Sequence, residues 1–237
     1  LASVLIVAVL GVGLAACGDD DDSSSSAGSS TTAAGGGGKC TVGVSWNNYQ
    51  EERWAKWDEP AVKAAIQAGG GTYISNDAKS SATTQASNVE NLISQGADAL
   101  IILAQDGTAI LPAVQSAVDQ GIPVVAYDRL IENAGTLYLS FDNVGVGKAM
   151  ADIIFPLVPE GNYAIIKGNQ ADANADFLRA GMEEVIGAAV TAGDIVIPEG
   201  CEQYTDNWDP ANAQTNMENC LTAAGNDIQA VLAENDG

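Results

Sequence analysis

The fold is decided by residues 99–129, which have the sequence ALIILAQDGTAILPAVQSAVDQGIPVVAYDR. Two short apolar runs rich in β-branched residues, 99–103 and 123–127, predict strands, and residues 109–120 between them carry apolar side chains at helical spacing. Gly121 stands where a left-handed residue would end that helix. A strand, a helix and a second strand in this order predict a parallel pair joined by a right-handed crossover.

The same alternation continues on both sides of this stretch. Further strands are predicted at residues 41–45, 73–75, 137–140, 163–167, 194–197 and 230–233. Further helices are predicted at residues 61–68, 83–95, 145–157, 175–188 and 211–223, and glycines at 69–71, 96 and 225 stand at helix ends.

These elements divide into two series. Four strand–helix units up to Asp128 predict one sheet, residues 137–143 predict a short strand leading away from it, and a second series begins near Gly145. We therefore expect an α/β protein with two Rossmann-like lobes of parallel sheets, joined by a hinge of crossover strands. The first lobe is expected at residues 39–140 and the second at 141–237.

Residues 1–17 have the features of a lipoprotein export signal. The apolar run that begins at Leu1 ends in the sequence LAAC. A helix that spans a bilayer needs about 20 apolar residues, and this run is shorter. We expect a signal peptide that is truncated at its start, with Cys17 as the lipidation site; an ordinary buried apolar segment is the alternative. Residues 18–38, an Asp run followed by Ser, Thr, Ala and Gly, predict a disordered tether. The protein is then exported and lipid-anchored to the cell membrane, at its outer face or in the periplasm.

The composition excludes several function classes. Nine Lys and Arg stand against 31 Asp and Glu, which gives a formal net charge of -22. Nucleic acid is therefore not an expected partner, because phosphate binding needs clustered basic residues, and an anionic ligand would be repelled. The chain has no His, the commonest metal ligand and general base, so serine-triad hydrolysis and most zinc chemistry lack their usual residues, and no catalytic residue or metal site is predicted.

Three cysteines remain once Cys17 is assigned to lipid. Cys40, Cys201 and Cys220 would lie in an oxidising compartment, where disulfides persist, and an odd number leaves at least one of them free. We favour a disulfide between Cys201, near a strand, and Cys220, on the helix that follows. Three unpaired cysteines are the alternative.

Polar residues follow nearly every predicted strand. In open α/β sheets ligands bind beyond the carboxyl ends of the strands, and a pocket between two lobes is a common small-molecule site. Amide and carboxylate groups beside an indole face suit a neutral polyol such as a sugar. Turn chemistry is the better explanation for any one of these segments, and only the set of segments together favours a ligand site. The segments are WNN at 46–48, ND at 76–77, QD at 105–106, DR at 128–129, NQADAN at 169–174, DNW at 206–208 and END at 234–236.

The three arginines make the polar segments more informative. Arg129 comes directly after a predicted strand and Arg53 stands beside Trp54, so we expect both guanidinium groups to donate to a ligand. The alternatives are a surface ion pair of Arg53 with a neighbouring glutamate, Glu51 or Glu52, and a brace between the lobes for Arg129. For the third arginine, at position 179, a salt bridge on a helix surface or at the hinge is favoured over ligand contact.

Together these residues resemble a known family. The resemblance is to the D-xylose-binding proteins of bacterial ABC transporters, which belong to the type I periplasmic sugar-binding family, and it runs in order from about Cys40 to the last residue. The stretches that carry it are ERW at 52–54, AYDR at 126–129, SFDN at 140–143, GNY at 161–163, DAN at 172–174, FLRAG at 177–181, NW at 207–208 and END at 234–236.

The resemblance implies a binding protein and not an enzyme. A monosaccharide, D-xylose first among the candidates, would be captured between the lobes and passed to an ABC permease in the membrane, with no cofactor. The implied sugar-binding residues are Arg53, Arg129, Asp172, Asn174, Trp208 and Asn235, with Trp54 and Asp128 as second-tier pocket residues. Chains of this family continue beyond the strand that bears Asn235, so the second lobe is expected to be incomplete.

Other interpretations stay open. A chemosensory sugar receptor would use the same site, and a carbohydrate-active enzyme would need a carboxylate pair such as Asp58 with Glu59 or Asp128 with Asp172. A cytoplasmic repressor needs a basic DNA-binding segment where this chain has an acidic, Ser-rich one. Xylose, arabinose, glucose and galactose are not distinguished by these arguments.

Overall fold

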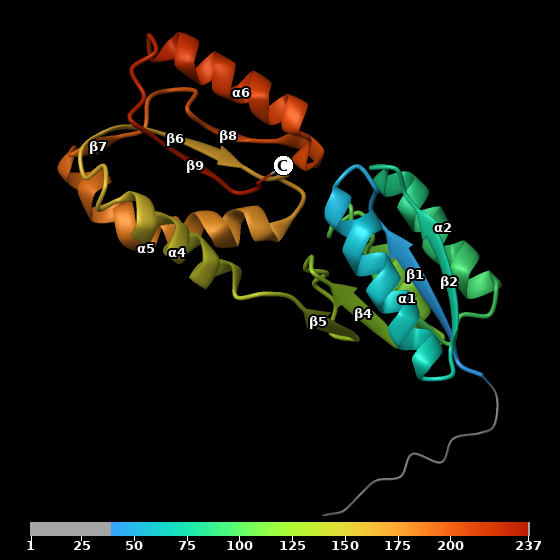
Figure 1. Ribbon diagram of the computed structural model, residues 1–237. Coiled ribbons are helices and arrows are strands. Elements are labelled where there is room, and N and C mark those ends of the chain that lie inside the picture. The colour runs from blue at the N-terminus through green and yellow to red at the C-terminus, as the bar shows by residue number, and fades with distance from the viewer. Residues whose placement is uncertain (1–38, 237) are drawn as a thin grey trace, which may run out of the picture. The chain divides into compact units, whose positions relative to one another are not determined.

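The computed structural model describes residues 39–236. The expected signal peptide, the tether and the lipidation candidate Cys17 lie outside the described residues. Within them the predicted α/β alternation is confirmed, and it forms two parallel sheets (Figure 1). The first lobe contains β1 (Thr41–Trp46), the π-helical turn η1 (Trp54–Asp58), α1 (Glu59–Ala68), β2 (Thr72–Asp77), α2 (Ala82–Ser94), β3 (Ala99–Ile102), α3 (Leu111–Asp119), β4 (Val124–Tyr127) and β5 (Thr136–Leu139). The second contains α4 (Asn143–Ile154), β6 (Gly161–Lys167), α5 (Ala173–Ala192), β7 (Ile195–Val196), β8 (Glu202–Tyr204), the 3₁₀ turn η2 (Asp206–Trp208), α6 (Pro210–Ala223) and β9 (Ala230–Ala233).

The first sheet has the strand order β2-β1-β3-β4-β5, with every neighbouring pair parallel. Alternate residues of a strand face opposite sides, so the two faces carry different cores. Leu100 and Ile102 pack with α2 and α3, whereas Val44 and Trp46 form a second cluster with residues of η1 and α1. Helices on both faces explain why the central strands β3 and β4 are apolar along their whole length.

One expectation about the first sheet was wrong. The strand β5 does not lead away from the sheet but is its fifth member, because it pairs in parallel with β4 from Val124↔Thr136 to Tyr127↔Leu139. It is an edge strand, and Leu137 and Leu139 are exposed on it. The chain leaves the first lobe through residues 140–142, and α4 begins at Asn143.

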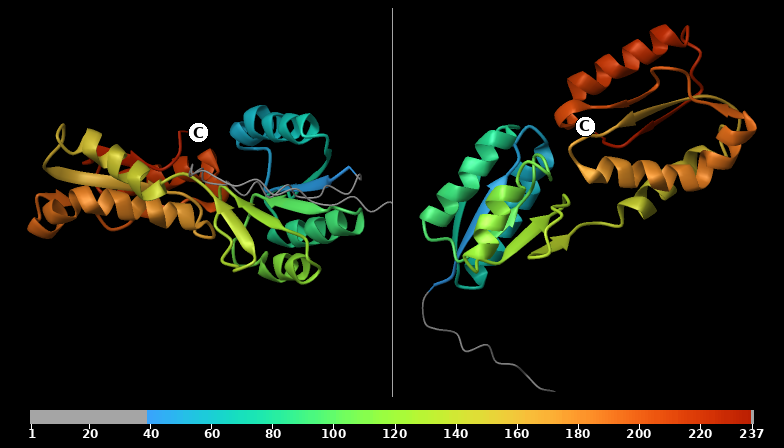
Figure 2. Two further views of the ribbon diagram at one scale, coloured as in Figure 1. Left: turned by 90° about the horizontal axis from the view of Figure 1, so that it is seen from below. Right: turned by 180° about the vertical axis from the view of Figure 1, so that it is seen from behind.

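The second sheet is built around β6. Its start pairs with β7, its end with β8, and the residues 163–166 pair with β9, all in parallel. The helices α4 and α5 cover one face of this sheet and α6 covers the other (Figures 1 and 2). Tyr163 and Ile165 pack with α4 and α5, whereas Ala164 packs with α6. The strand β8 was not predicted, because Glu202, Gln203 and Tyr204 have no apolar alternation and gain their conformation from pairing with β6.

Two glycines bring α4 and α5 into close contact. A Cβ atom on Gly147 would lie 1.9 Å from the backbone oxygen of Leu178, and one on Gly181 would lie 1.9 Å from that of Val144. No side chain fits at either position, so the two helices touch through their backbones. This contact fixes the first turns of α5, which carry part of the site described below.

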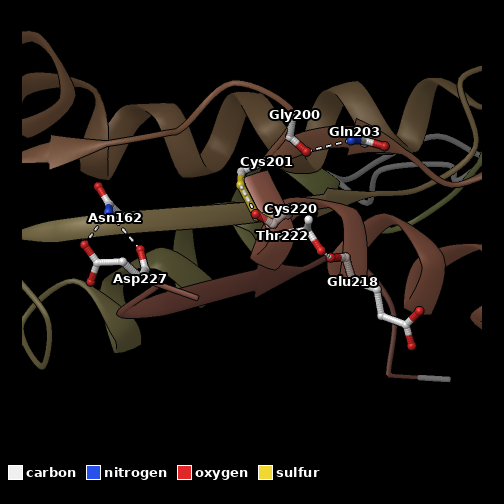
Figure 3. The surroundings of a disulfide bond; sticks show 8 residues. All are labelled: Asn162, Gly200, Cys201, Gln203, Glu218, Cys220, Thr222 and Asp227. Atoms are coloured by element: carbon white, nitrogen blue, oxygen red, sulfur yellow. Dashed lines mark hydrogen bonds between the residues drawn. A yellow bond between two sulfur atoms is a disulfide. The ribbon is translucent and has the colours of Figure 1, made fainter. Parts of the chain in front are cut away.

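The predicted cysteine pair forms a disulfide. Cys201 precedes β8, Cys220 lies on α6, and both are fully buried. Figure 3 shows the bond tying α6 to the segment before β8, between the Gln203 to Gly200 and Thr222 to Glu218 hydrogen bonds. Cys40 is free and exposed. Among residues 39–236, no helix has the length and apolar character required to cross a membrane.

Candidate functional site

The loops that follow the strands of both sheets surround one pocket of about 210 Å³. This volume lies below the roughly 300–1,000 Å³ of sites for drug-sized ligands, so it suits a smaller molecule. All eight residues predicted for sugar binding line it, six as primary and two as second-tier candidates. They are Arg53, Arg129, Asp172, Asn174, Trp208 and Asn235, with Trp54 and Asp128.

Arg53 is held by two carboxylates of the first lobe. Its Nη1 lies 3.0 Å from Asp128 Oδ1 and its Nε lies 3.1 Å from Asp58 Oδ2. Its guanidinium carbon lies 4.3 Å from the ring centroid of Trp54. Burial alone would lower the pKa of Arg53, but its pairs with Asp128 and Asp58 raise it above the ordinary value. The expected alternative of an ion pair with a neighbouring glutamate is wrong, because Arg53 pairs across the loop instead.

Arg129 is the most deeply buried cation of the pocket, at 3% exposure. Its Nη2 lies 3.1 Å from Glu51 Oε1, its Nη1 donates to the backbone oxygen of Ala104 at 3.2 Å, and its Nε lies 3.0 Å from Asp172 Oδ2. The last pair joins the end of β4 to the start of α5. Arg129 therefore braces the two lobes while it lines the pocket, so the two roles considered for it are compatible.

Asp128 is positioned by a left-handed backbone at the end of β4. Its φ is 63°, which is a strained conformation for a residue other than glycine and is typical of functional sites. Its amide donates to Leu139 O at 2.7 Å, and Ser140 Oγ donates to its carbonyl at 2.7 Å. Burial raises the pKa of Asp128 above its usual range, although the charges of Arg53 and Arg129 lower it.

Asp172 connects the start of α5 to an indole ring. It caps the helix, accepting the amide of Asn174 at 3.0 Å, and its Oδ2 accepts Trp208 Nε1–H at 3.1 Å. Burial raises the pKa of Asp172, and the charge of Arg129 opposes that shift. The Trp208 ring lies directly over Gly168, where a Cβ atom would be 2.0 Å from it. Asp172 therefore holds the edge of the indole, and Gly168 supports one of its faces.

Asn174 joins the lobes through its side-chain amide. Its Nδ2 donates to the carbonyl oxygen of Asp128 at 3.1 Å, and its Oδ1 accepts Asn143 Nδ2–H at 2.9 Å. Asn143, at the start of α4, also lines the pocket. The hydrogen bonds of the Asn174 side chain therefore hold the start of α5 and the loop after β4 in one arrangement.

Two further hydrogen bonds between the lobes lie outside the pocket lining. Gln105, 4% exposed, donates from Nε2 to Asn207 Oδ1 at 2.7 Å, and Gly107 N donates to Ala171 O at 3.3 Å. Asn207 and Trp208 both have positive φ, 58° and 56°. Two successive left-handed residues turn the chain sharply, so that Asn207 reaches the first lobe while Trp208 faces the pocket.

Six other lining residues were not predicted as ligand residues: Glu51, Phe141, Asn143, Val146, Leu178 and Glu234. Glu51 was considered only as a partner of Arg53, and its contact with Arg129 spans 78 positions of sequence, which local pattern cannot show. Glu234 directly follows β9, so its place after a strand was the available signal. Arg179 is not among the lining residues and pairs with Glu183 and Glu202 on the helix surface.

The charge of the pocket favours a neutral ligand. Two arginines stand against four acids, Glu51, Asp128, Asp172 and Glu234. An anionic ligand would meet net negative charge, whereas hydroxyl groups can both donate to carboxylates and accept from guanidinium groups. Within residues 39–236 there is no group of three or more His, Cys, Asp or Glu side chains able to hold a metal ion.

Two α/β lobes, each with a parallel sheet, surround one polar pocket that is lined in part by two tryptophans. This arrangement defines a binding protein that encloses its ligand. Residues 42–237 match the family model described as the periplasmic binding protein domain, and the chain belongs to that family. This confirms the family and the fold class that the sequence suggested.

Two related proteins and one solved structure show how similar this chain is to known proteins. The D-xylose-binding periplasmic protein of Escherichia coli (strain K12) is 38% identical, over 82% of this chain and 58% of that protein. The multiple sugar-binding periplasmic receptor ChvE of Rhizobium radiobacter is 36% identical, over 84% of this chain and 60% of that protein. An ABC transporter solute binding protein from Clostridium phytofermentans, solved with bound β-D-glucose, has a TM-score of 0.77 and 29% identity over 83% of this chain and 65% of that one. The chain thus spans less than two thirds of the length of these proteins.

Proposed function

We propose that this protein is an extracytoplasmic solute-binding protein that captures a monosaccharide, D-xylose first among the candidates, and delivers it to an ABC importer. The observation that carries the proposal is the convergence of Arg53, Arg129, Asp172 and Trp208 on one pocket of about 210 Å³. Both lobes supply these groups, so a sugar that contacts them all stabilises the arrangement in which the lobes are close.

The mechanism is binding without a chemical step. Arg53 and Arg129 present fixed donors, the acids that hold them present acceptors, and Trp208 offers an apolar face to the C–H side of a pyranose ring. Asn174 and Asn235 complete the polar wall from the second lobe. Because the arginines are already paired, they cost little to order when the sugar arrives. The sugar-loaded form then docks on a membrane permease.

D-xylose is supported by the 38% identity to a D-xylose-binding protein. A hexose differs from D-xylose by one exocyclic carbinol, which a single pocket side chain can admit or exclude. A related protein is named for binding multiple sugars and a structural neighbour holds glucose, so hexoses are the competitors to be measured. The sequence of residues 1–38 supports export and a lipid anchor at Cys17.

Calorimetric titration of the intact protein with D-xylose, D-glucose, L-arabinose and D-ribose tests the proposal. Saturable binding with D-xylose tightest is the expected result. Binding of another of these sugars with a preference of tenfold or more would keep the sugar-binding function and overturn the choice of D-xylose. No saturable binding of any of the four would overturn the function.

A chemosensory receptor is the second candidate, because the Rhizobium radiobacter relative is named a receptor. It would use the same pocket and differ only in the partner of the sugar-loaded form. Deletion of the protein separates the two uses: loss of growth and uptake on low D-xylose indicates transport, whereas normal uptake with loss of the response to D-xylose indicates sensing.

A further inference from the structure

Glu234 holds an unusual position in the pocket wall. Glu234 directly follows β9. Its backbone amide donates to Ile166 O at 3.1 Å, which extends the pairing with β6 by one hydrogen bond. Its Oε2 accepts the amide of Gly168 at 2.7 Å. Two bonds therefore fix both the backbone and the carboxyl group, and the side chain lines the pocket.

The second carboxyl oxygen of Glu234 is unsatisfied. Oε1 is buried and has no hydrogen-bond partner within residues 39–236. A buried carboxyl oxygen without a partner costs free energy, and such groups in native proteins call for a partner such as a ligand. The bound Oε2 prevents the group from turning away to solvent.

The nearest charges do not fill this gap. Lys167 is the closest cation on β6, but its Nζ lies 2.9 Å from Asp176 Oδ1 and 3.6 Å from the ring centroid of Tyr204. Arg179 on α5 pairs with Glu183 and Glu202. Asp176, on the same helix, repels a negative charge on Glu234.

We propose that Glu234 is a further ligand-contacting residue of this pocket and that its Oε1 forms a hydrogen bond with a hydroxyl group of the bound sugar. This inference rests on the proposed function. It assigns to the second lobe a polar contact beyond those of Asp172, Asn174 and Asn235, and it places that contact at the end of β9, beside the Trp208 ring that covers Gly168.

The contact makes sugar affinity depend on pH. Burial raises the pKa of Glu234 to about 8, against the opposing effects of the Gly168 amide and Lys167, so the group is mostly protonated at pH 7. The neutral acid can donate its Oε1–H to a sugar hydroxyl oxygen, and a hydrogen bond made by the neutral form raises the pKa of Glu234 in the complex. Affinity is then greatest below pH 8 and falls as the pH rises above it, and binding near pH 8 takes up protons.

A purely structural role for Glu234 makes a different prediction. If the carboxyl group only holds Gly168 under Trp208, a glutamine can replace it fully, because the glutamine amide oxygen accepts the same N–H bond. In that case Glu234→Gln and the wild-type protein have the same dependence of sugar affinity on pH. If Oε1 contacts the sugar, the glutamine keeps a hydrogen-bonding group there but cannot titrate. The pH profile therefore separates positioning from ligand contact.

The experiment is a calorimetric titration of the intact protein with D-xylose at pH 6.5, 8 and 9.5, in two buffers of different ionisation enthalpy. The variants are Glu234→Gln, Glu234→Ala and, as a matched control, Glu160→Gln, an exposed acid ahead of β6. We expect wild-type affinity to fall about fivefold from pH 6.5 to 9.5 with proton uptake at pH 8, and the control to behave alike. Glu234→Gln should lose this dependence, and Glu234→Ala should bind at least tenfold more weakly at pH 6.5.

Each outcome has a distinct meaning. If the wild-type protein binds sugar and Glu234→Gln keeps the wild-type dependence of affinity on pH, the assignment of Glu234 alone is overturned. If Glu234→Ala does not fold, as judged by circular dichroism, the Glu234→Gln profile decides the matter. Absence of binding of every monosaccharide by the wild-type protein would overturn the proposed function, and this assignment with it.

Discussion

Arg129 and Asp172 form a buried ion pair between the two lobes, with 3.0 Å between Nε and Oδ2 and side-chain exposures of 3% and 2%. Asp172 also caps α5 and accepts the indole N–H of Trp208. One carboxylate thus links the first lobe, the start of a helix and an aromatic wall. Because both charges are buried, removing Asp172 leaves Arg129 with Glu51 as its remaining carboxylate partner, whereas removing Arg129 leaves the Asp172 carboxylate without its cation.

Asp172→Asn should therefore affect stability and binding together. The amide can still cap α5, but it carries no charge, and Arg129 keeps only Glu51 as a carboxylate partner. We therefore expect a loss of about 2 kcal/mol in the free energy of unfolding and at least tenfold weaker D-xylose binding. Urea unfolding and calorimetry measure the two effects. Asp142→Asn, which changes the exposed cap of α4, is the matched control and should cost less than about 1 kcal/mol. Equal behaviour of the two variants would contradict the role given to the buried pair.

The contact between α4 and α5 gives a test of the second lobe alone. In Gly181→Ala the new Cβ atom would lie 1.9 Å from Val144 O, so the helices must separate, at a cost of about 3 kcal/mol. Gly187→Ala, on the same helix, meets only the flexible end of Glu183 and should be neutral or stabilising by up to about 1 kcal/mol. Thermal unfolding of both variants checks this difference. A stable Gly181→Ala would show that the helices are not in backbone contact.

The elements of this fold were predictable where the sequence pattern alone determines them. Strands such as β3 and β4 are apolar because they are buried on both faces, and positive φ at Gly96 and Gly121 confirms the predicted helix ends. The π-helical turn η1 and the 3₁₀ turn η2 were not predicted, because each depends on contacts made elsewhere. Trp208, for example, is placed by Gly168 and Asp172.

The sequence predicted residues that line the pocket, but it did not predict which of these residues pair with one another. The rule that ligands bind beyond the ends of parallel strands selected Arg129, Asp172 and Trp208, and all three line one pocket. Their partners follow from three-dimensional proximity. The alternative considered for Arg53, an ion pair with Glu51 or Glu52, was therefore wrong, and Glu51 pairs with Arg129 instead. Whether these residues bind sugar stays a prediction.

Stability should also vary with pH through Glu234. Its pKa is raised from the ordinary value to about 8 in the folded protein, so its contribution is fully present below the unfolded pKa of about 4.3 and is lost as the pH rises through 8. Relative to Glu234→Gln, the wild-type protein should lose at least about 1 kcal/mol between pH 5 and 9. Urea titrations at these two pH values measure it. Parallel curves for the two proteins would show that the carboxyl group is not desolvated.

The hydrogen bond between Gln105 and Asn207 should favour the arrangement that binds sugar. In Gln105→Ala the lobes lose a contact of 2.7 Å, so we expect several-fold weaker D-xylose binding with little change in unfolding. Asn207→Gly keeps the left-handed backbone and removes the same bond. A double-mutant cycle of the two should give a coupling of about 1 kcal/mol in binding. Gln115→Ala, an exposed change on α3, is the control, and additive effects in the cycle would exclude a direct contact.

The role of Trp208 as a sugar-facing wall is open to direct measurement. Its ring is 9% exposed, rests on Gly168 and is oriented by Asp172, so a bound pyranose meets a fixed apolar face. Trp208→Ala should lower D-xylose affinity by more than about 1.5 kcal/mol, about tenfold, and should remove most of the change in tryptophan fluorescence on binding. Trp57, 72% exposed on η1 and absent from the pocket lining, provides the matched control. Trp57→Ala should bind and respond as the wild type does, and wild-type affinity in Trp208→Ala would remove the indole from the site.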